Sequence, residues 1–142
     1  MPATIKFIDH WDRVDVCLDI GGGRFSNVAD YLGSIGVSYY NYDPYNQSYE
    51  QNLNAVEHCS NSRSDLVMIN NVLNVIQDKQ GRYKVLMQAH NACHAGTTVY
   101  TLIYEGDKTG VGKSTGSDKW QENARTATYM DMHSQFFGDV KK

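Results

Sequence analysis

Residues 14–30, VDVCLDIGGGRFSNVAD, decide the fold, because an apolar run ends there in three glycines and a helical pattern follows. Apolar side chains alternate and accumulate over residues 15–20, as they do in a buried strand. Glycines 21–23 permit a tight turn and a close approach of the backbone to a ligand. From Phe25 to Ile35 the apolar residues fall at helical spacing. A strand, a glycine turn and a helix together predict the first half of a nucleotide-binding βαβ unit.

The residues around the glycines narrow the choice of ligand. Segment 21–26, GGGRFS, approximates the dinucleotide fingerprint G-x-G-x-x-G/A. The next expected strand, residues 37–42, ends at Asp43, which stands 20 residues after Gly23 and is placed to bind ribose hydroxyls. Asp19 lies inside the first strand, where a carboxylate needs backbone amides or a cationic ligand as partners.

Three motifs in this order resemble the class I S-adenosylmethionine-dependent methyltransferases. They are DIGGG at residues 19–23, YDP at 42–44 and DLVMINNVLNVIQD at 65–78, and the resemblance covers residues 15–105. It implies a turn around the amino acid part of S-adenosylmethionine (SAM), an acid that binds its ribose, and a polar run that lines the pocket for its adenine and methionine parts. The residues that match these roles are Asp19, Gly21, Gly22 and Gly23 for the turn, Asp43 for the ribose, and Asn70 and Asn71 for the pocket.

The resemblance implies an α/β fold in a single domain over residues 1–142, a Rossmann-like parallel open sheet with flanking helices. Further strands are expected at residues 65–70 and 97–104, with helices over 78–95 and 125–137. Only 21 residues separate Asp43 from Asp65, enough for one helix but not for another strand and a second crossover. We therefore expect the family's third strand to be reduced or absent. Members of the family continue after the last helix into an antiparallel strand pair, and because this sequence ends at Lys142, we expect that pair to be reduced or absent as well.

A dinucleotide is the rival ligand for the same crevice. SAM carries a cationic sulfonium and an amino group, which suit an acid such as Asp19, whereas an anionic pyrophosphate is repelled by it. A third possibility, a P-loop ending at Gly112-Lys113-Ser114, is rejected because Asp107 stands where its first glycine belongs.

Composition excludes several classes of partner. The 142 residues carry a net charge of −3, with a pI near 5.9, and no basic run that indicates nucleic acid or an acidic membrane. No membrane-spanning run or signal peptide is expected. The sequence has three cysteines, an odd number, and their spacing is not that of metal ligands. We therefore predict that the thiols are reduced, that the protein is cytoplasmic, and that it has no metal site.

The catalytic role is more open than the cofactor. Residues 105–123 form an expected loop after the last strand, which is either a lid or substrate loop or a solvated loop. Glu105 and Asp107 are its candidate bases. A small-molecule or protein acceptor is favoured, because the D/N-P-P-Y/W signature of nucleic-acid amino methyltransferases is absent and Asn70-Asn71-Val72-Leu73 occupies its place.

The short chain leaves little surface for an acceptor, which keeps a second class of function open. The alternatives are a non-catalytic SAM-binding protein, a SAM-consuming protein, or a regulatory partner of another methyltransferase. An exposed sheet edge also favours self-association into a homo-oligomer. Tyr39, Tyr45, Tyr49 and Trp120 are expected to be exposed, either for a partner or over the ligand.

Overall fold

The computed structural model describes all residues from 1 to 142 and has a mixed α/β architecture. The chain divides into two compact units. The first comprises residues 1–70 and 91–102, and the second comprises residues 71–90 and 103–142. The single domain expected over residues 1–142 stays a prediction.

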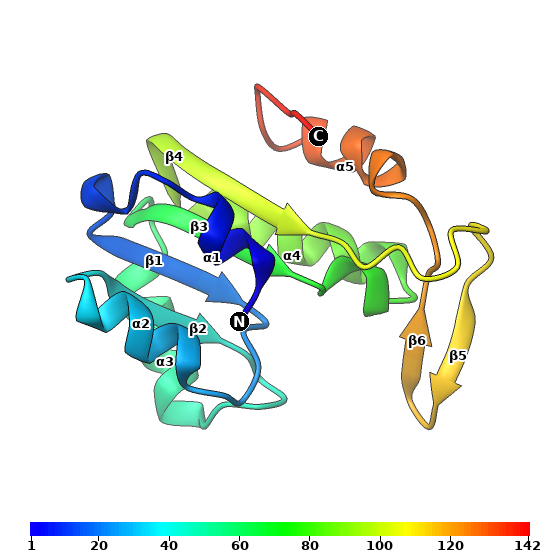
Figure 1. Cartoon of the computed structure of the whole chain (residues 1–142), viewed down its shortest axis with the longest axis horizontal. Coiled ribbons are helices and arrows are strands. Elements are labelled where there is room, and N and C mark those ends of the chain that lie inside the picture. Colours follow the sequence, from blue (N-terminus) through cyan, green and yellow to red (C-terminus); the bar gives the residue numbers. More distant parts are fainter. The chain divides into compact units, whose positions relative to one another are not determined.

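A four-stranded, fully parallel sheet forms the centre of the first unit (Figure 1). Its strands are β1 (Val16–Ile20), β2 (Ser38–Tyr42), β3 (Ser64–Asn70) and β4 (Cys93–Leu102), in the order β2-β1-β3-β4. β3 has a nearly continuous apolar sequence, as parallel strands covered on both faces do, and it is buried along most of its length. β2 and β4 are the two edges of the sheet.

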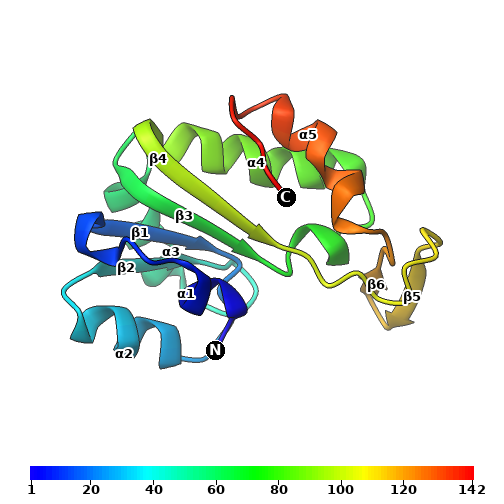
Figure 2. The ribbon, with the colours of Figure 1, turned by 45° about the horizontal axis from the view of Figure 1, so that its top comes forward.

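Helices cover both faces of this sheet, as Figures 1 and 2 show. α1 (Ala3–Phe7) and α2 (Asn27–Ser34) lie on one face, and α3 (Tyr49–Cys59) lies on the other. A short 3-10 helix, η1 (Trp11–Arg13), precedes β1. Ser48 caps α3 in a capping box with Gln51, as S/T-x-x-E/Q sequences do. The core under α1 and α2 includes Ile5, Val28, Leu32, Cys17, Leu66 and Met68.

The strand order is consistent with a Rossmann-like fold. The standard doubly wound sheet has the strand order 3-2-1-4-5-6. Without its strand 3, the next four strands have the order 2-1-4-5, which becomes β2-β1-β3-β4 when they are numbered along this chain. A single helix, α3, connects β2 to β3, as the short spacing between Asp43 and Asp65 predicts. The order reverses at β1, so the carboxyl ends of β1 and β3 flank the position at which open α/β sheets bind ligands.

The second unit combines short helices with a β-hairpin. It contains η2 (Leu73–Val75), most of α4 (Lys79–Ala92), η3 (Thr126–Tyr129) and α5 (Met130–Ser134). Its hairpin pairs β5 (Lys113–Gly116) with β6 (Lys119–Gln121) in antiparallel orientation. The aromatic rings of Tyr83, His90, His133, Phe136 and Phe137 contact one another in this unit.

Several expected boundaries were wrong. The helix expected over residues 78–95 ends at Ala92 and continues directly into β4, so Gly96 lies within a strand, with a φ of 96°, beside an irregular register. Part of the loop expected over residues 105–123 is the β5-β6 hairpin. The last helical segment ends at Ser134 instead of Phe137.

Some expected exposures also differ. Phe25 is 72% exposed and precedes α2, and Ile35 is 44% exposed, so neither is a buried position of that helix. Tyr39 and Trp120 are half-buried, whereas Tyr45 and Tyr49 are exposed as expected. Cys17, Cys59 and Cys93 form no disulfide. None of the helices combines the length and the apolar character that a membrane crossing requires.

Candidate functional site

The three glycines form a turn whose backbone amides all have protein acceptors. Gly21 donates to the Tyr42 carbonyl at 2.8 Å, Gly22 to Asn41 Oδ1 at 2.9 Å, and Gly23 to Asp43 Oδ2 at 2.9 Å. Gly21 and Gly23 have φ values of 73° and 81°, a conformation that favours glycine. The turn is therefore fixed against the end of β2 before any ligand is considered.

Gly22 differs from the other two glycines in the small space around it. A Cβ atom at this position would lie 2.7 Å from both Asn41 Oδ1 and Asp19 Oδ2. Both distances are far below a normal carbon–oxygen contact, so the backbone at Gly22 lies directly against these two side chains.

Asp19 is the most unusual residue of the first unit. It is 1% exposed, and its Oδ2 accepts a hydrogen bond of 2.6 Å from the Tyr39 hydroxyl, while its Oδ1 has no hydrogen-bond partner. Burial raises the pKa of Asp19 to about 6, against the hydrogen bond from Tyr39, and the nearby Asp43 carboxylate adds to the rise. A buried carboxylate with one unpaired oxygen is costly for the free protein and is suited to a cationic ligand.

Asp43 is also buried, but both of its oxygens are occupied. Oδ1 accepts from the amides of Tyr45 and Asn46, and Oδ2 accepts from the amide of Gly23 and from Asn46 Nδ2. A carboxylate has about four lone-pair positions, so these four donors fill it. A ribose hydroxyl must therefore displace one donor, and the exposed Asn46 side chain is the only one of the four that is not a backbone amide.

Two amide side chains not singled out from the sequence complete the turn. Asn41 Nδ2 and Gln47 Nε2 each donate to the Gly23 carbonyl at 2.8 Å. Tyr39 was also missed as a partner of Asp19. The available signal was strand alternation, because Tyr39 and Asn41 occupy alternate positions of β2, opposite Cys17 and Asp19 of β1.

The remaining predicted residues have varied positions. Asn70 ends β3, and its Oδ1 accepts a hydrogen bond from Thr4 of α1 at 2.9 Å. Asn71 is exposed, has a φ of 57° and begins the second unit. The structure thus joins Gly23 to Asp43 by a hydrogen bond and places the Asp19 carboxylate close to Gly22 in the same glycine turn.

Glu105 and Asp107 belong to the second unit and are weak bases. Hydrogen bonds from Thr126 lower the pKa of Glu105, and a hydrogen bond from the Thr109 hydroxyl lowers that of Asp107. An efficient general base has a pKa near the working pH, so these shifts disfavour either carboxylate in that role.

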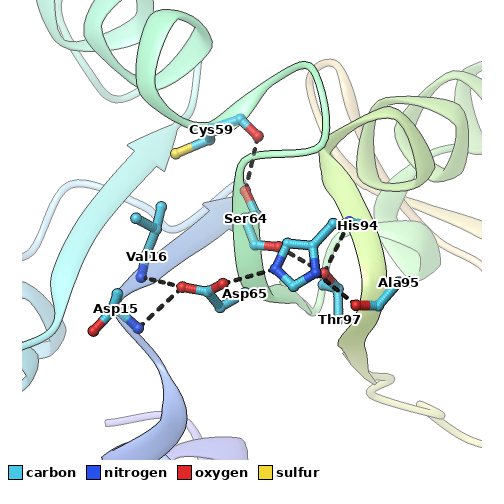
Figure 3. A network of polar contacts seen from close by, with 8 residues as sticks. All are labelled: Asp15, Val16, Cys59, Ser64, Asp65, His94, Ala95 and Thr97. Carbon is cyan, nitrogen blue, oxygen red and sulfur yellow. Dashed lines mark hydrogen bonds and ion pairs between the residues drawn. The ribbon is translucent and has the colours of Figure 1, made fainter.

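A second polar network lies at the amino ends of the strands and is structural (Figure 3). Asp65 Oδ2 accepts from the amides of Asp15 and Val16, and Asp65 Oδ1 lies 2.7 Å from His94 Nε2. His94 Nδ1 lies 2.7 Å from the Ala95 carbonyl. Because both ring nitrogens face acceptors, the ring fits its doubly protonated form and is not free to act as a base.

Comparison with protein families, with curated proteins and with solved structures finds no match for the chain. No group of three or more His, Cys, Asp or Glu side chains is arranged to hold a metal ion.

Proposed function

We propose that the chain binds SAM at the glycine turn and transfers its methyl group to a small molecule or a protein. The observation that carries this proposal is the Asp19 carboxylate, which is buried and has an unpaired Oδ1. A cationic group supplies the favourable charge and the hydrogen bond that this oxygen lacks. The amino acid part of SAM carries an ammonium group.

The state of the glycine amides argues against a dinucleotide. In dinucleotide sites, free amides of the glycine turn and the following helix face the pyrophosphate. Here the amides of Gly21, Gly22 and Gly23 all donate to protein oxygens. Asp19 and Asp43 add two buried carboxylates beside the turn, which disfavours an anionic ligand further.

Each residue of the turn has a distinct role in this proposal. Asp19 pairs with the ammonium group, Gly22 keeps the backbone free of a side chain, and Asp43 binds ribose in place of the Asn46 side chain. SAM supplies an electrophilic methyl group, so the protein needs chiefly to orient the acceptor. The pocket role of Asn70 and Asn71 and the base role of Glu105 and Asp107 stay predictions.

A SAM-binding protein that does not transfer the methyl group is the second candidate. This alternative includes a protein that sequesters or consumes SAM and one that regulates another methyltransferase. It is favoured by the lowered pKa values of Glu105 and Asp107, which leave the chain without a well-tuned base among the predicted residues.

Calorimetry with SAM, S-adenosylhomocysteine, NAD and ATP tests the cofactor. We expect SAM to bind and Asp19→Asn to weaken it at least about tenfold, because the replacement removes a charge-assisted hydrogen bond. Asp12→Asn is the matched control, since it removes an exposed carboxylate from the same unit. Tight NAD binding without SAM binding would reject the proposal.

Transfer is tested separately with radiolabelled SAM and a cell extract. Label in a macromolecule or in a methylated acceptor, formed together with S-adenosylhomocysteine, supports a methyltransferase. Label that remains in intact SAM, or that appears in a fragment of SAM without S-adenosylhomocysteine, supports the second candidate and rejects transfer.

A further inference from the structure

A cavity of about 490 Å³ lies within the second unit, on residues that the SAM proposal does not use. Its wall combines side chains from α4, η3 and α5 with the segments on both sides of the β5-β6 hairpin. The volume is in the range of sites for small organic molecules, which is about 300–1,000 Å³.

The charge of the wall is predominantly positive. Arg82 is neutralised by an ion pair with Glu122, and it donates from Nε to the Ile76 carbonyl. Lys108 and Arg125 also line the cavity, and neither forms an ion pair, although Lys108 lies near enough to Glu105 to help lower the pKa of that carboxyl. Two cations without a paired carboxylate therefore line one cavity of a protein whose net charge is −3.

Tyr129 adds a hydrogen-bond donor without an acceptor. It lines the cavity and is 3% exposed, and its hydroxyl is buried without a hydrogen-bond partner. Burial raises the pKa of Tyr129, although the positive charge of Arg82 opposes this, so the hydroxyl remains a donor at neutral pH. A buried hydroxyl that lacks a partner is stabilised by any ligand that supplies an acceptor oxygen.

We propose that this cavity binds a small organic molecule that carries a carboxylate or phosphate group. Lys108 and Arg125 supply the opposite charge, and a shift of the Tyr129 ring, whose hydroxyl is closed to solvent in this structure, lets that hydroxyl donate to the anionic oxygen. Ala124 and Met132 provide apolar wall for the carbon part of the ligand. The site stands independently of the SAM proposal, because every residue that forms it belongs to the second unit.

Titrations with benzoate, phenyl phosphate, inorganic phosphate and neutral benzamide, followed by calorimetry or NMR, test the site. We expect saturable binding of benzoate or phenyl phosphate, and the stronger of the two identifies the preferred anion. Arg125→Gln and Tyr129→Phe should each weaken the preferred probe about fivefold or more, the loss expected for one hydrogen bond or partly exposed charge. Lys119→Gln, an exposed lysine of the hairpin without an ion pair, should leave affinity unchanged.

The proposal is overturned if neither organic anion binds, if benzamide binds as tightly as benzoate, or if Arg125→Gln and Tyr129→Phe both bind like the wild type. Stability measurements on the same samples separate weakened binding from loss of the fold. Failure of SAM to bind does not affect these outcomes, and Asp19→Asn should bind the anion like the wild type.

Discussion

The Tyr39 hydroxyl and Asp19 Oδ2 are joined by a hydrogen bond of 2.6 Å between neighbouring strands β2 and β1. This contact satisfies one oxygen of a carboxylate that is otherwise desolvated, and the other oxygen has no partner. The ionised form of Asp19 is therefore destabilised by burial in the first unit. A buried carboxyl whose pKa is shifted by burial and by a neighbouring charge, beside a glycine turn, is a candidate for a functional site.

Replacing Asp19 should change how stability depends on pH. The folded pKa of about 6 exceeds the unfolded value of 3.8, so the folded protein binds the proton more tightly, and stability falls as pH rises from about 4 to 6. The shift corresponds to roughly 3 kcal/mol. Asp19→Asn removes this loss, so urea unfolding should show its stability rising relative to the wild type between pH 4 and pH 7. A difference that is the same at every pH would show that Asp19 ionises normally.

The side chain of Asn46 donates to Asp43 Oδ2, the carboxylate that is proposed to bind ribose. Asn46→Ala frees one acceptor position on Asp43, while three backbone amides continue to hold that carboxylate. We expect S-adenosylhomocysteine to bind up to about fivefold tighter, which corresponds to about one hydrogen bond of 1 kcal/mol. Calorimetry measures the change, with Asn54→Ala on exposed α3 as the control. Weaker binding by Asn46→Ala would mean that Asp43 does not receive the ribose.

Much of the first unit could be predicted from the sequence, for a physical reason. β1, β2 and β3 were located to within one residue, because β1 ends at glycines, β2 ends just before Asp43-Pro44, and β3 is an apolar run that begins after a polar turn. The junction of α4 with β4 was misplaced, since nothing in the local sequence stops the helix at Ala92 and Gly96 suggests a later end. The β5-β6 hairpin was missed because its strands, KSTG and KWQ, are short and mostly polar.

The candidate site was predictable only in part. Asp19, the three glycines and Asp43 follow from motif spacing, and the structure places both carboxylates beside the glycine turn. The saturation of Asp43 depends on the fold of the Pro44–Gln47 segment, which spacing does not reveal. The position of Tyr39 beside Asp19 depends on strand register, which was not predicted.

His94 should stabilise the fold only at mildly acidic and neutral pH. Hydrogen bonds to Asp65 and the Ala95 carbonyl raise its pKa, so its contribution is complete below about pH 6.5 and is lost as pH rises through the folded value. Desolvation raises the pKa of Asp65, but hydrogen bonds from His94, Val16 and Asp15 lower it by more, so the net pKa is below its usual value. The stability that Asp65 contributes is therefore lost as the pH falls and the carboxylate is protonated. The pair is therefore most stabilising between about pH 4 and pH 6.5.

Urea unfolding of His94→Gln at pH 5.5 and pH 8.5 measures this effect. The His94 side chain is 40% exposed, so we expect a loss of only about 1 kcal/mol at pH 5.5 and a smaller loss at pH 8.5. His58→Gln is the control for the pH dependence, because the His58 ring contacts a backbone carbonyl and stacks on Tyr40 but contacts no carboxylate. A larger loss at pH 8.5 than at pH 5.5 would contradict the charged form of His94.

Gly22 and Gly33 offer a matched pair of substitutions in the same unit. A Cβ at Gly22 lies 2.7 Å from Asn41 Oδ1 and Asp19 Oδ2, whereas one at Gly33 meets no atom within 4 Å. Gly22→Ala should therefore destabilise the fold by about 1–3 kcal/mol, the usual cost of forcing a group into packed structure, and should abolish SAM binding. Gly33→Ala, within α2, should stabilise it by about 0.5–1 kcal/mol. Thermal unfolding and calorimetry measure both effects, and a Gly22→Ala protein as stable as Gly33→Ala would show that the turn is not packed against Asp19.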